Sequence, residues 1–396
     1  MRSRCWPAFI LILSSFAWGQ QKPPPLPPPL DPLVYEGLDQ KKIDEAIEAG
    51  VAFLKRLKAE KGGDRTDELV LWTFVQAGVP HDDPLFVELL ERMLKDPLEA
   101  TYRVSLQAMI LQKVDEAKHL NRLIECAQFL ADNQCKNGQW SYGQPIAPVT
   151  ATGGTASKPK AGTQAKPRIP VTPRRTPNGP AGGDNSNTQY AALGVRACHD
   201  AGIVFPKAMI TDAREAWVQS QQAKSAGKKG AVASGPAGAP PRGWNYTMAG
   251  SDAYGSMTAG GAGCVVIYDH ILGMDWKKDP VALSGIAWLG AHFRVDDNPE
   301  YDRDDKVKWH HYYLYALERV GILFGTEKMG SNYWYKEGVK YLLETQSGGK
   351  WGDDTRGGGW EKDMRDTCYG ILFLRRATKP LIDVASTDSS KTPSKP

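Results

Sequence analysis

The sequence predicts an all-α fold of six helical hairpins, because one apolar helix pattern recurs along the chain. Each apolar segment is hydrophobic around most of its circumference, as expected of a helix that is buried on both sides. Five of the six begin with threonine, and five carry leucine five residues later. The segments begin at Thr66, Thr101, Thr188, Thr258, Tyr312 and Thr367. A threonine in this place predicts a helix cap.

A more amphipathic helix with charged positions precedes each apolar segment. These outer helices are expected at residues 43–57, 85–95, 119–133, 208–222, 281–293 and 333–345. A hairpin that cannot bury its own apolar face must stack on its neighbours. Six such hairpins could form an open solenoid or a closed ring, and the repeat pattern is compatible with both architectures.

Residues 1–19 are typical of a secretory signal peptide. Arg2 and Arg4 form a basic start, residues 8–16 a short apolar stretch, and Ala17 and Gly19 a small-x-small cleavage site. The apolar stretch is shorter than the roughly 20 residues that span a bilayer, and no later segment reaches that length. The sequence therefore predicts an exported protein, periplasmic or extracellular, that is not transmembrane.

Composition shifts divide the rest of the chain. Residues 20–39 are expected to form a proline-rich spacer, and residues 40–380 to hold the hairpins. Two insertions, 144–183 and 222–242, lack periodicity and aromatic residues, so we expect both to be disordered, like the tail at 381–396.

The positive charge lies outside the predicted helices. The net charge is +4, but the signal holds two arginines, the first insertion six basic residues and the second four, with no acid in any of the three. The remainder therefore carries about −8. A nucleic-acid-binding protein would place its basic residues on a folded face among aromatic residues, so we expect no nucleic-acid partner. The basic insertions could contact an acidic surface.

Cysteine usage does not indicate a disulfide framework. Five cysteines remain after signal removal, which is an odd number, and no CxxC pair exists. Small apolar core residues are the expected role for most of them. Their redox state is left open.

Two loops that follow outer helices share a glutamine–tryptophan pattern. Residues 134–140 read QCKNGQW and residues 346–351 read QSGGKW, and a stretched third copy is expected from Gln222 to Gly243 and Trp244. We expect glutamine to bond a helix end, glycine to make the turn and tryptophan to pack on the next hairpin. The pattern resembles the repeat of the squalene–hopene cyclases and of the wider prenyltransferase and squalene-oxidase repeat family.

This resemblance covers about residues 40–380 and implies a closed α/α toroid, with inner helices around a central cavity. Family cyclases have two toroidal domains, whereas this chain has residues for one, and a fold alone does not determine an activity. The resemblance also implies a catalytic DxDD motif, whose letters Asp302, Asp304 and Asp305 match. Their surroundings, NPEYDRDDKVK, are strongly charged, so the alternative interpretation is a solvated loop.

The protein prenyltransferase β subunits are a second group of relatives, and resemblance to them implies zinc. They hold the metal with Asp-x-Cys on one inner helix and a histidine on a neighbouring helix. Asp366 and Cys368 match the first part, and His311 completes the candidate set. Here the histidine precedes the pair, which reverses the family order, and the alternative is a helix cap and a core cysteine. No other cofactor is expected.

Amides, hydroxyls, aromatic rings and two imidazoles would meet where the inner helices begin. Such a surface suits a peptide, glycan, polar small molecule or isoprenoid, although capping and packing are the alternative roles. The candidate binding residues are Asn185, Asn187, Gln189, Tyr190, Trp244, Tyr254, Ser256, Thr258, His310, His311, Tyr312, Tyr313 and Tyr369.

Three functions follow from these patterns. The first is an exported, non-catalytic toroid that binds a ligand or protein at the mouth of the inner helices. The second is an enzyme of the terpenoid cyclase or prenyltransferase type, with Asp304 as proton donor or with zinc. The third is a structural protein of the cell envelope.

Overall fold

The computed structural model describes residues 32–147, 149, 168–174, 181–222, 238–248, 252–301, 309–352 and 359–381. These residues form an all-α fold, with twelve α-helices, one 3-10 helix, η1 (Pro32–Tyr35), and four two-residue strands. In this part of the chain, no helix is both long and apolar enough to cross a membrane.

A helix is present at every predicted position. The outer helices are α1 (Gln40–Lys61), α3 (Pro84–Lys95), α5 (Leu120–Asp132), α7 (Lys207–Ser220), α9 (Pro280–Ala291) and α11 (Trp334–Thr345). The inner helices are α2 (Asp67–Ala77), α4 (Thr101–Asp115), α6 (Asn185–Asp200), α8 (Gly255–Leu272), α10 (His310–Phe324) and α12 (Gly359–Leu374). The last four inner helices begin earlier than the predicted starts.

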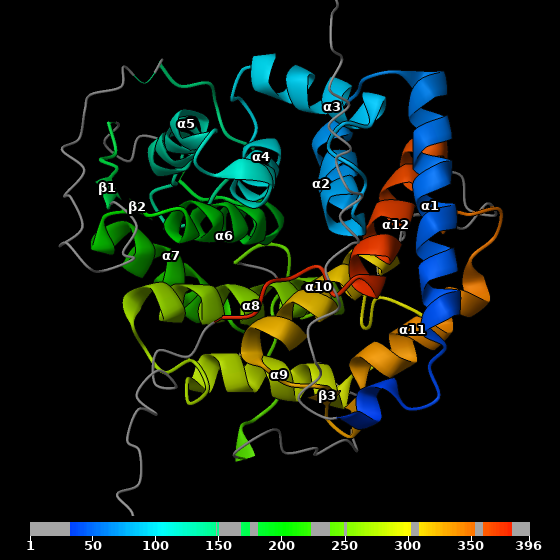
Figure 1. Cartoon of the computed structure of the whole chain (residues 1–396). Coiled ribbons are helices and arrows are strands. Elements are labelled where there is room, and N and C mark those ends of the chain that lie inside the picture. The colour runs from blue at the N-terminus through cyan, green and yellow to red at the C-terminus, as the bar shows by residue number, and fades with distance from the viewer. Residues whose placement is uncertain are drawn as a thin grey trace, which may run out of the picture.

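The inner helices contact one another in a cyclic order. Each packs on the next one along the chain, and α12 packs on α2. Most outer helices lie against the inner helix that precedes them, and α1 follows the same rule by packing on α12. Figure 1 shows α1 and α12 side by side although they are at opposite ends of the described chain. The first and last hairpins are therefore neighbours.

Aspartates cap four of the helices, and the predicted threonine caps are wrong. Asp39, Asp83, Asp184 and Asp279 each accept a bond from a backbone amide in the first turn of α1, α3, α6 and α9. Thr66 occupies the cap position of α2 but makes no side-chain cap bond. Thr188, Thr258 and Thr367 lie inside their helices, where each hydroxyl accepts the backbone amide of a tryptophan.

Each of the three loops holds one tryptophan that is hydrogen-bonded to the helix before the loop. The indole Nε1 atoms of Trp140, Trp244 and Trp351 donate to carbonyl oxygens near the ends of α5, α7 and α11, at 2.8, 2.8 and 2.9 Å. All three side chains are fully buried. Gly138 makes the tight turn in the first copy with a φ of +84°, and a Cβ there would lie 2.2 Å from the Asp212 carbonyl oxygen.

Three glutamines link each of these loops to the outer helix of the next hairpin. The side-chain amides of Gln134, Gln221 and Gln346 donate to backbone carbonyl oxygens of Met209, Val281 and Ala46, at 2.9, 2.9 and 2.8 Å. The prediction named Gln222 for the second copy, and this is corrected to Gln221. The Gln222 side chain instead donates to the carbonyl oxygen of Ser220, the last residue of α7 in its own hairpin, at 3.2 Å.

Part of the first insertion is packed against the helices. Strand β1 (Ile169–Pro170) pairs in parallel with β2 (Ile203–Val204), Val171 is buried, and Arg174 contacts Asp132 of α5 with Nε at 2.9 Å. The predicted disorder of residues 144–183 therefore does not hold for residues 168–174. The second pair of strands is antiparallel and joins β3 (Lys328–Met329) to β4 (Asn332–Tyr333).

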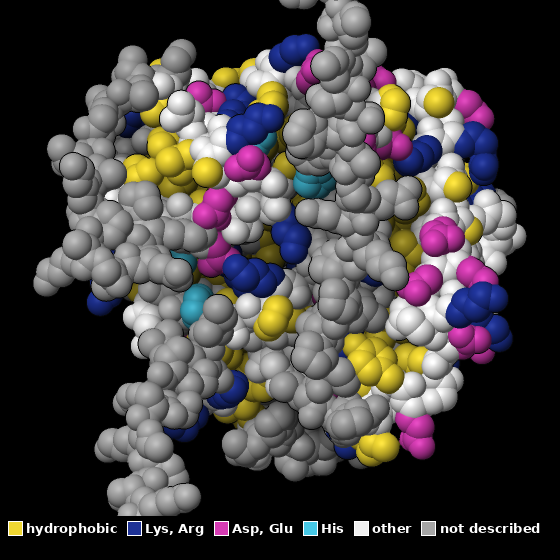
Figure 2. Space-filling view, viewed as in Figure 1, with side chains coloured by type: hydrophobic (Ala, Val, Ile, Leu, Met, Phe, Trp, Pro, Cys, Tyr) yellow, Lys and Arg dark blue, Asp and Glu magenta, His cyan; other side chains and the backbone are white. Residues whose placement is uncertain are grey.

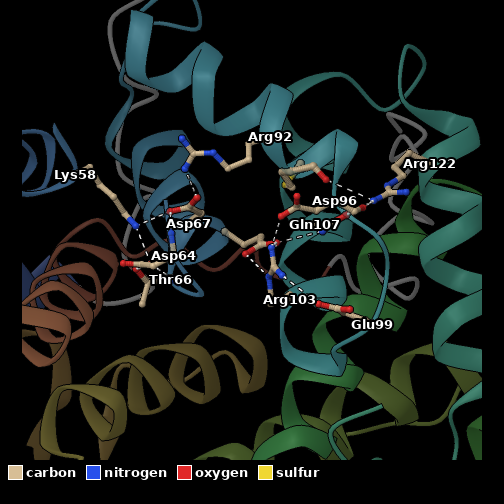
Figure 3. A network of polar contacts seen from close by, with 12 residues as sticks. Lys58, Asp64, Thr66, Asp67, Arg92, Asp96, Glu99, Arg103, Gln107 and Arg122 are labelled. Atoms are coloured by element: carbon tan, nitrogen blue, oxygen red, sulfur yellow. Dashed lines mark hydrogen bonds and ion pairs between the residues drawn. The ribbon is translucent and has the colours of Figure 1, made fainter. Parts of the chain in front are cut away.

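Ion pairs buried between the first four helices hold this part of the molecule together, and Arg122 of α5 joins them through hydrogen bonds to the Asp96 carbonyl and Gln107 (Figure 3). Lys58 of α1 is 2% exposed and contacts Asp64 at 2.9 Å and Asp67 at 2.5 Å. Glu68 of α2 is 1% exposed and accepts from Arg103 Nε at 2.9 Å and from Gln107 at 3.2 Å. Because each buried charge has a partner of opposite sign, its desolvation is offset.

The segment that follows α12, residues 375–381, contacts three other inner helices and is seen in red in Figure 1. Arg375 Nε donates to the Gln76 carbonyl of α2 at 3.0 Å, and Thr378 donates its backbone amide and hydroxyl to Glu318 of α10 at 3.0 and 2.7 Å. Arg196 of α6 then donates to the Lys379 carbonyl at 2.6 Å. This C-terminal segment joins the ends of the inner helices. On the same face, described basic, acidic and hydrophobic side chains are interspersed (Figure 2).

Candidate binding site at the starts of the inner helices

Six of the predicted binding residues make hydrogen bonds or ring contacts that connect loops to the starts of helices. Asn187 bonds the capping Asp184, and Asn185 accepts from Gln139 at 2.8 Å and donates to the Asn245 carbonyl at 2.8 Å. Thr258 accepts the amide of Trp244 at 3.1 Å. The capping and packing alternative therefore describes their contacts. Tyr254 and Ser256 likewise contact the loop before α10, through Tyr301 and Asn298.

Four other predicted residues meet between the inner helices and include most of a tyrosine cluster. This central tyrosine cluster consists of Tyr102, Tyr190, Tyr312, Tyr315 and Tyr369. Gln189, also predicted, donates to the Tyr312 hydroxyl at 2.5 Å. The Tyr102 and Tyr369 hydroxyls are 2.7 Å apart, and the Tyr102 and Tyr190 ring centroids are 3.9 Å apart. These contacts join α4, α6, α10 and α12, so hydrogen bonds cross between inner helices that are not neighbours.

A buried arginine lies beside the cluster. Arg319 is 4% exposed, donates from Nη2 to Gln189 Oε1 at 2.7 Å, and lies over the rings of Tyr315 and Tyr190 at 4.3 and 5.5 Å. Its Nη1 atom has no hydrogen-bond partner in the described structure. Burial works against the charged form, but the surrounding tyrosines and Glu318 raise the pKa of Arg319 above its ordinary value. The guanidinium thus stays charged, held by one amide and two ring faces.

The hydroxyls of Tyr102, Tyr312 and Tyr369 stay protonated. Burial raises the pKa of Tyr102, Tyr312 and Tyr369 well above that of an ordinary tyrosine, and neighbouring tyrosines raise it further. Tyr102 and Ser186 are partly exposed, and Ser186 Oγ lies 3.2 Å from the Tyr312 hydroxyl. A chain of hydrogen bonds therefore runs from Ser186, at the surface at the start of α6, through Tyr312 and Gln189 to Arg319.

Four residues at this site were not predicted from the sequence, namely Tyr102, Ser186, Tyr315 and Arg319, although one signal was present. Tyr312, Tyr315 and Arg319 are spaced i, i+3 and i+7, which places them on one face of α10. Arg319 is a charged residue within an apolar segment. It could therefore have been predicted to lie beside these tyrosines, between the inner helices. Tyr102 and Ser186 have no comparable signal, because a residue in a first turn can face a loop or a neighbouring helix.

The three predicted metal ligands do not form a group. His311 Nδ1 is 3.5 Å from Asp366 Oδ2, which also lies 3.5 Å from Lys362 Nζ. Cys368 is fully buried, and burial raises its pKa to about 12, which disfavours the thiolate that zinc requires. No three His, Cys, Asp or Glu residues of the described chain are grouped to hold a metal ion. His311 Nε2 is buried without a partner there.

The remaining predicted residues have separate surroundings. His310 Nε2 lies 2.7 Å from the Val295 carbonyl oxygen, and burial together with His311 lowers its pKa to about 3, so it is neutral. Tyr313 is buried and donates to the Arg294 carbonyl at 3.1 Å. The predicted catalytic residues Asp302, Asp304 and Asp305 lie outside the described residues.

No protein-family model matches this chain, and no curated protein matches it either.

Proposed function

We propose that this chain is an exported α/α toroid of the prenyltransferase and squalene-cyclase type that binds a ligand or a partner protein without catalysis. The cyclic contacts of the inner helices support a closed toroid. So does Gln346, whose bond to Ala46 joins the last repeat to α1 as Gln134 joins α5 to α7.

The main support for a non-catalytic function is that hydrogen-bonded tyrosine, glutamine and arginine side chains occupy the space between the inner helices. A cyclase of this type needs a dry, aromatic-lined space beside a protonated acid. Here the Tyr102 hydroxyl is hydrogen-bonded to that of Tyr369, and the Tyr312 hydroxyl accepts from Gln189. A substrate at this level would have to displace these bonds. Binding at the surface of the mouth, next to Ser186 and Tyr102, requires no such displacement.

Thermal-shift and calorimetric titration with a panel of peptides, oligosaccharides and isoprenoids tests this proposal. Trp309, at the start of α10, is 37% exposed, so Trp309→Ala removes contact area at the mouth without opening the core. Met274 is 42% exposed just after the end of α8, and Met274→Ala is the matched control. We expect binding of one ligand class that Trp309→Ala weakens and Met274→Ala leaves unchanged.

The same preparation decides between binding and catalysis. Product analysis after incubation with squalene or a prenyl diphosphate should show no turnover. Turnover that Asp304→Asn abolishes would replace this proposal with the cyclase function, and turnover that needs zinc and Cys368 would replace it with the prenyltransferase function.

A further inference from the structure

The C-terminal segment, residues 375–381, lies against the inner helices outside any helix or strand. In Figure 1 its red coil runs from α12 across the middle of the view. Ala377 and Thr378 are buried, whereas Lys379 and Pro380 are exposed. The segment therefore covers the inner helices from outside, and its exposed part does not belong to the core.

A buried carboxylate receives the first polar groups of this segment. Glu318 of α10 is fully buried, and its two oxygens accept the Thr378 backbone amide at 3.0 Å and the Thr378 hydroxyl at 2.7 Å. A buried carboxylate without hydrogen-bond donors is strongly unfavourable. Both donors here come from one residue, so Glu318 depends on what occupies the position of Thr378.

Two charged residues of α6 contact the next two residues of the segment. Arg196 is 7% exposed and donates from Nη2 to the carbonyl oxygens of Lys379 at 2.6 Å and Pro380 at 3.3 Å. Asp200, one turn later on α6, lies 3.6 Å from Lys379 Nζ. Each contact thus joins groups of opposite polarity: acids face the donors and the lysine charge, and a base faces the carbonyl oxygens.

Packing of a chain end does not account for these contacts. A segment that only packs on the core buries apolar side chains and leaves its polar groups to water. Here Lys379 and Pro380 are exposed, and a buried arginine still reaches their carbonyl oxygens. Hydrogen bonds from fixed side chains to the main chain of an exposed segment are typical of peptide recognition.

The segment leaves α12 through a turn that is held by other residues. Arg376 has a φ of +46°, the left-handed conformation in which many helices end. Its guanidinium donates to Glu327 at 2.9 Å and lies over the ring of Tyr335 at 5.2 Å. These contacts do not involve Glu318 or Arg196, so they fix the turn independently of the residues that follow it.

We propose that Glu318, Arg196 and Asp200 form a second binding site, for a partner protein that presents the sequence Thr-Lys-Pro or Ser-Lys-Pro, and that residues 378–380 occupy this site in the free protein as a tethered competitor. Glu318 selects the hydroxyl and Asp200 the lysine, and proline restricts the preceding residue to extended backbone. The site is formed by the second halves of α6 and α10, whereas the mouth lies at their starts. This inference therefore does not rest on the proposed function.

Fluorescence anisotropy with a labelled ATKPLID peptide, the sequence of residues 377–383, tests the site in the full chain. In the unmodified protein the tethered copy competes at a high effective concentration, so we expect weak binding. Thr378→Pro removes both donors to Glu318, and we expect it to tighten peptide binding by about tenfold or more. Thr378→Ser keeps both donors and is the matched control, with binding as weak as in the unmodified chain.

Further substitutions locate the bound peptide. In the Thr378→Pro chain, Arg196→Met should remove the gain in affinity, because methionine fills similar space but cannot donate to the carbonyl oxygens. Trp309→Ala should leave peptide binding unchanged, which separates this site from the mouth. A peptide with valine in place of threonine should bind about tenfold more weakly or worse, because it lacks the hydroxyl.

Hydrogen exchange of the unmodified chain gives a second readout, which applies even if Thr378→Pro prevents folding. We expect the amides of residues 377–381 to exchange about tenfold faster or more than those in the middle of α10, through local opening. Excess free peptide should accelerate this exchange further, because it captures the site whenever the segment leaves it.

Three results would each overturn the inference. The first is exchange of the segment only together with α10, or exchange that free peptide does not accelerate, because the segment would then be a fixed part of the core. The second is a Thr378→Pro chain, folded by circular dichroism, that does not bind the peptide up to about 1 mM. The third is peptide binding that Arg196→Met does not weaken, which would place the peptide elsewhere.

Discussion

Three buried threonines show how single side chains connect successive elements. Thr188, Thr258 and Thr367 each accept the backbone amide of the tryptophan in the loop before their helix, at 3.0, 3.1 and 3.2 Å. An amide buried without a partner costs about 1–3 kcal/mol. The recurrence of threonine was visible in the sequence, but its partner was not, because the tryptophan reaches it from another part of the repeat.

Thr258→Val should lower the free energy of unfolding by about 1–3 kcal/mol, because valine has a similar shape but cannot accept the Trp244 amide. Chemical denaturation measures this change. Thr258→Ser retains the oxygen and is the control, with an expected loss of less than half as much. Equal losses in the two variants would show that packing of the methyl group matters more than the hydrogen bond.

Glu318 makes stability depend on pH. It is fully buried, and burial raises its pKa to about 7, although bonds from Thr378 and the nearby Arg319 and Arg376 oppose this rise. The folded state therefore binds the proton more tightly than the unfolded state, whose pKa is near 4.5. The contribution is most favourable below pH 4.5 and is lost as pH rises to 7, by roughly 3 kcal/mol.

Glu318→Gln should remove this dependence, since a glutamine can still bond the Thr378 amide and carries no charge. Unfolding midpoints measured from pH 4.5 to pH 8 are expected to decline less steeply in the variant than in the unmodified chain. Parallel profiles would mean that Glu318 titrates as it does in the unfolded chain.

At the scale of elements, periodicity predicted the helices well and their junctions poorly. Apolar patterns predicted the twelve helices of the described residues, because a helix that buries one face carries apolar residues at a regular spacing. Gln222 was named where Gln221 makes the bond, since two adjacent glutamines differ only in which one faces α9. The pairing of β1 with β2 was not predicted, because a strand of two residues is too short to show an alternating pattern of apolar side chains.

The glutamine links can be compared by substitution. Gln134→Ala, Gln221→Ala and Gln346→Ala should each cost about 1 kcal/mol, because each removes one hydrogen bond between successive repeats. Gln222→Ala is the control, since its side chain bonds Ser220 of its own hairpin and not the next one, and it should cost clearly less. Urea denaturation of the four variants gives the comparison. A larger cost at Gln222 than at Gln221 would contradict the assignment.

At the scale of the whole molecule, the contact between α1 and α12 gives the first hairpin two neighbours. A side chain at Gly50 would meet Ile371 at 2.9 Å and Trp351 at 3.3 Å, so Gly50→Leu forces the two helices apart. The overpacking cost is about 1–3 kcal/mol. We expect hydrogen exchange to show lost protection in α2, α11 and α12 together, with a single unfolding transition.

Glu48→Leu, on the exposed side of the same helix, is the control and should leave protection unchanged. Fraying confined to α1 in the Gly50→Leu variant would instead describe an open array, in which a terminal unit unfolds alone. This choice between an array and a closed set was open in the sequence, because a repeat pattern does not record whether its first and last members touch.

The contacts of the C-terminal segment determine when the chain can complete its folding during synthesis. A polypeptide emerges from the ribosome with its N-terminus first, so α1 is complete long before α12 exists. The bond from Gln346 to Ala46 spans 300 positions, and the ties of residues 375–381 to α2, α6 and α10 come later still. Such distant pairings carry the largest chain-closure cost and form last. The growing chain therefore cannot close early, and completion of the native structure waits for the final helix to be synthesised.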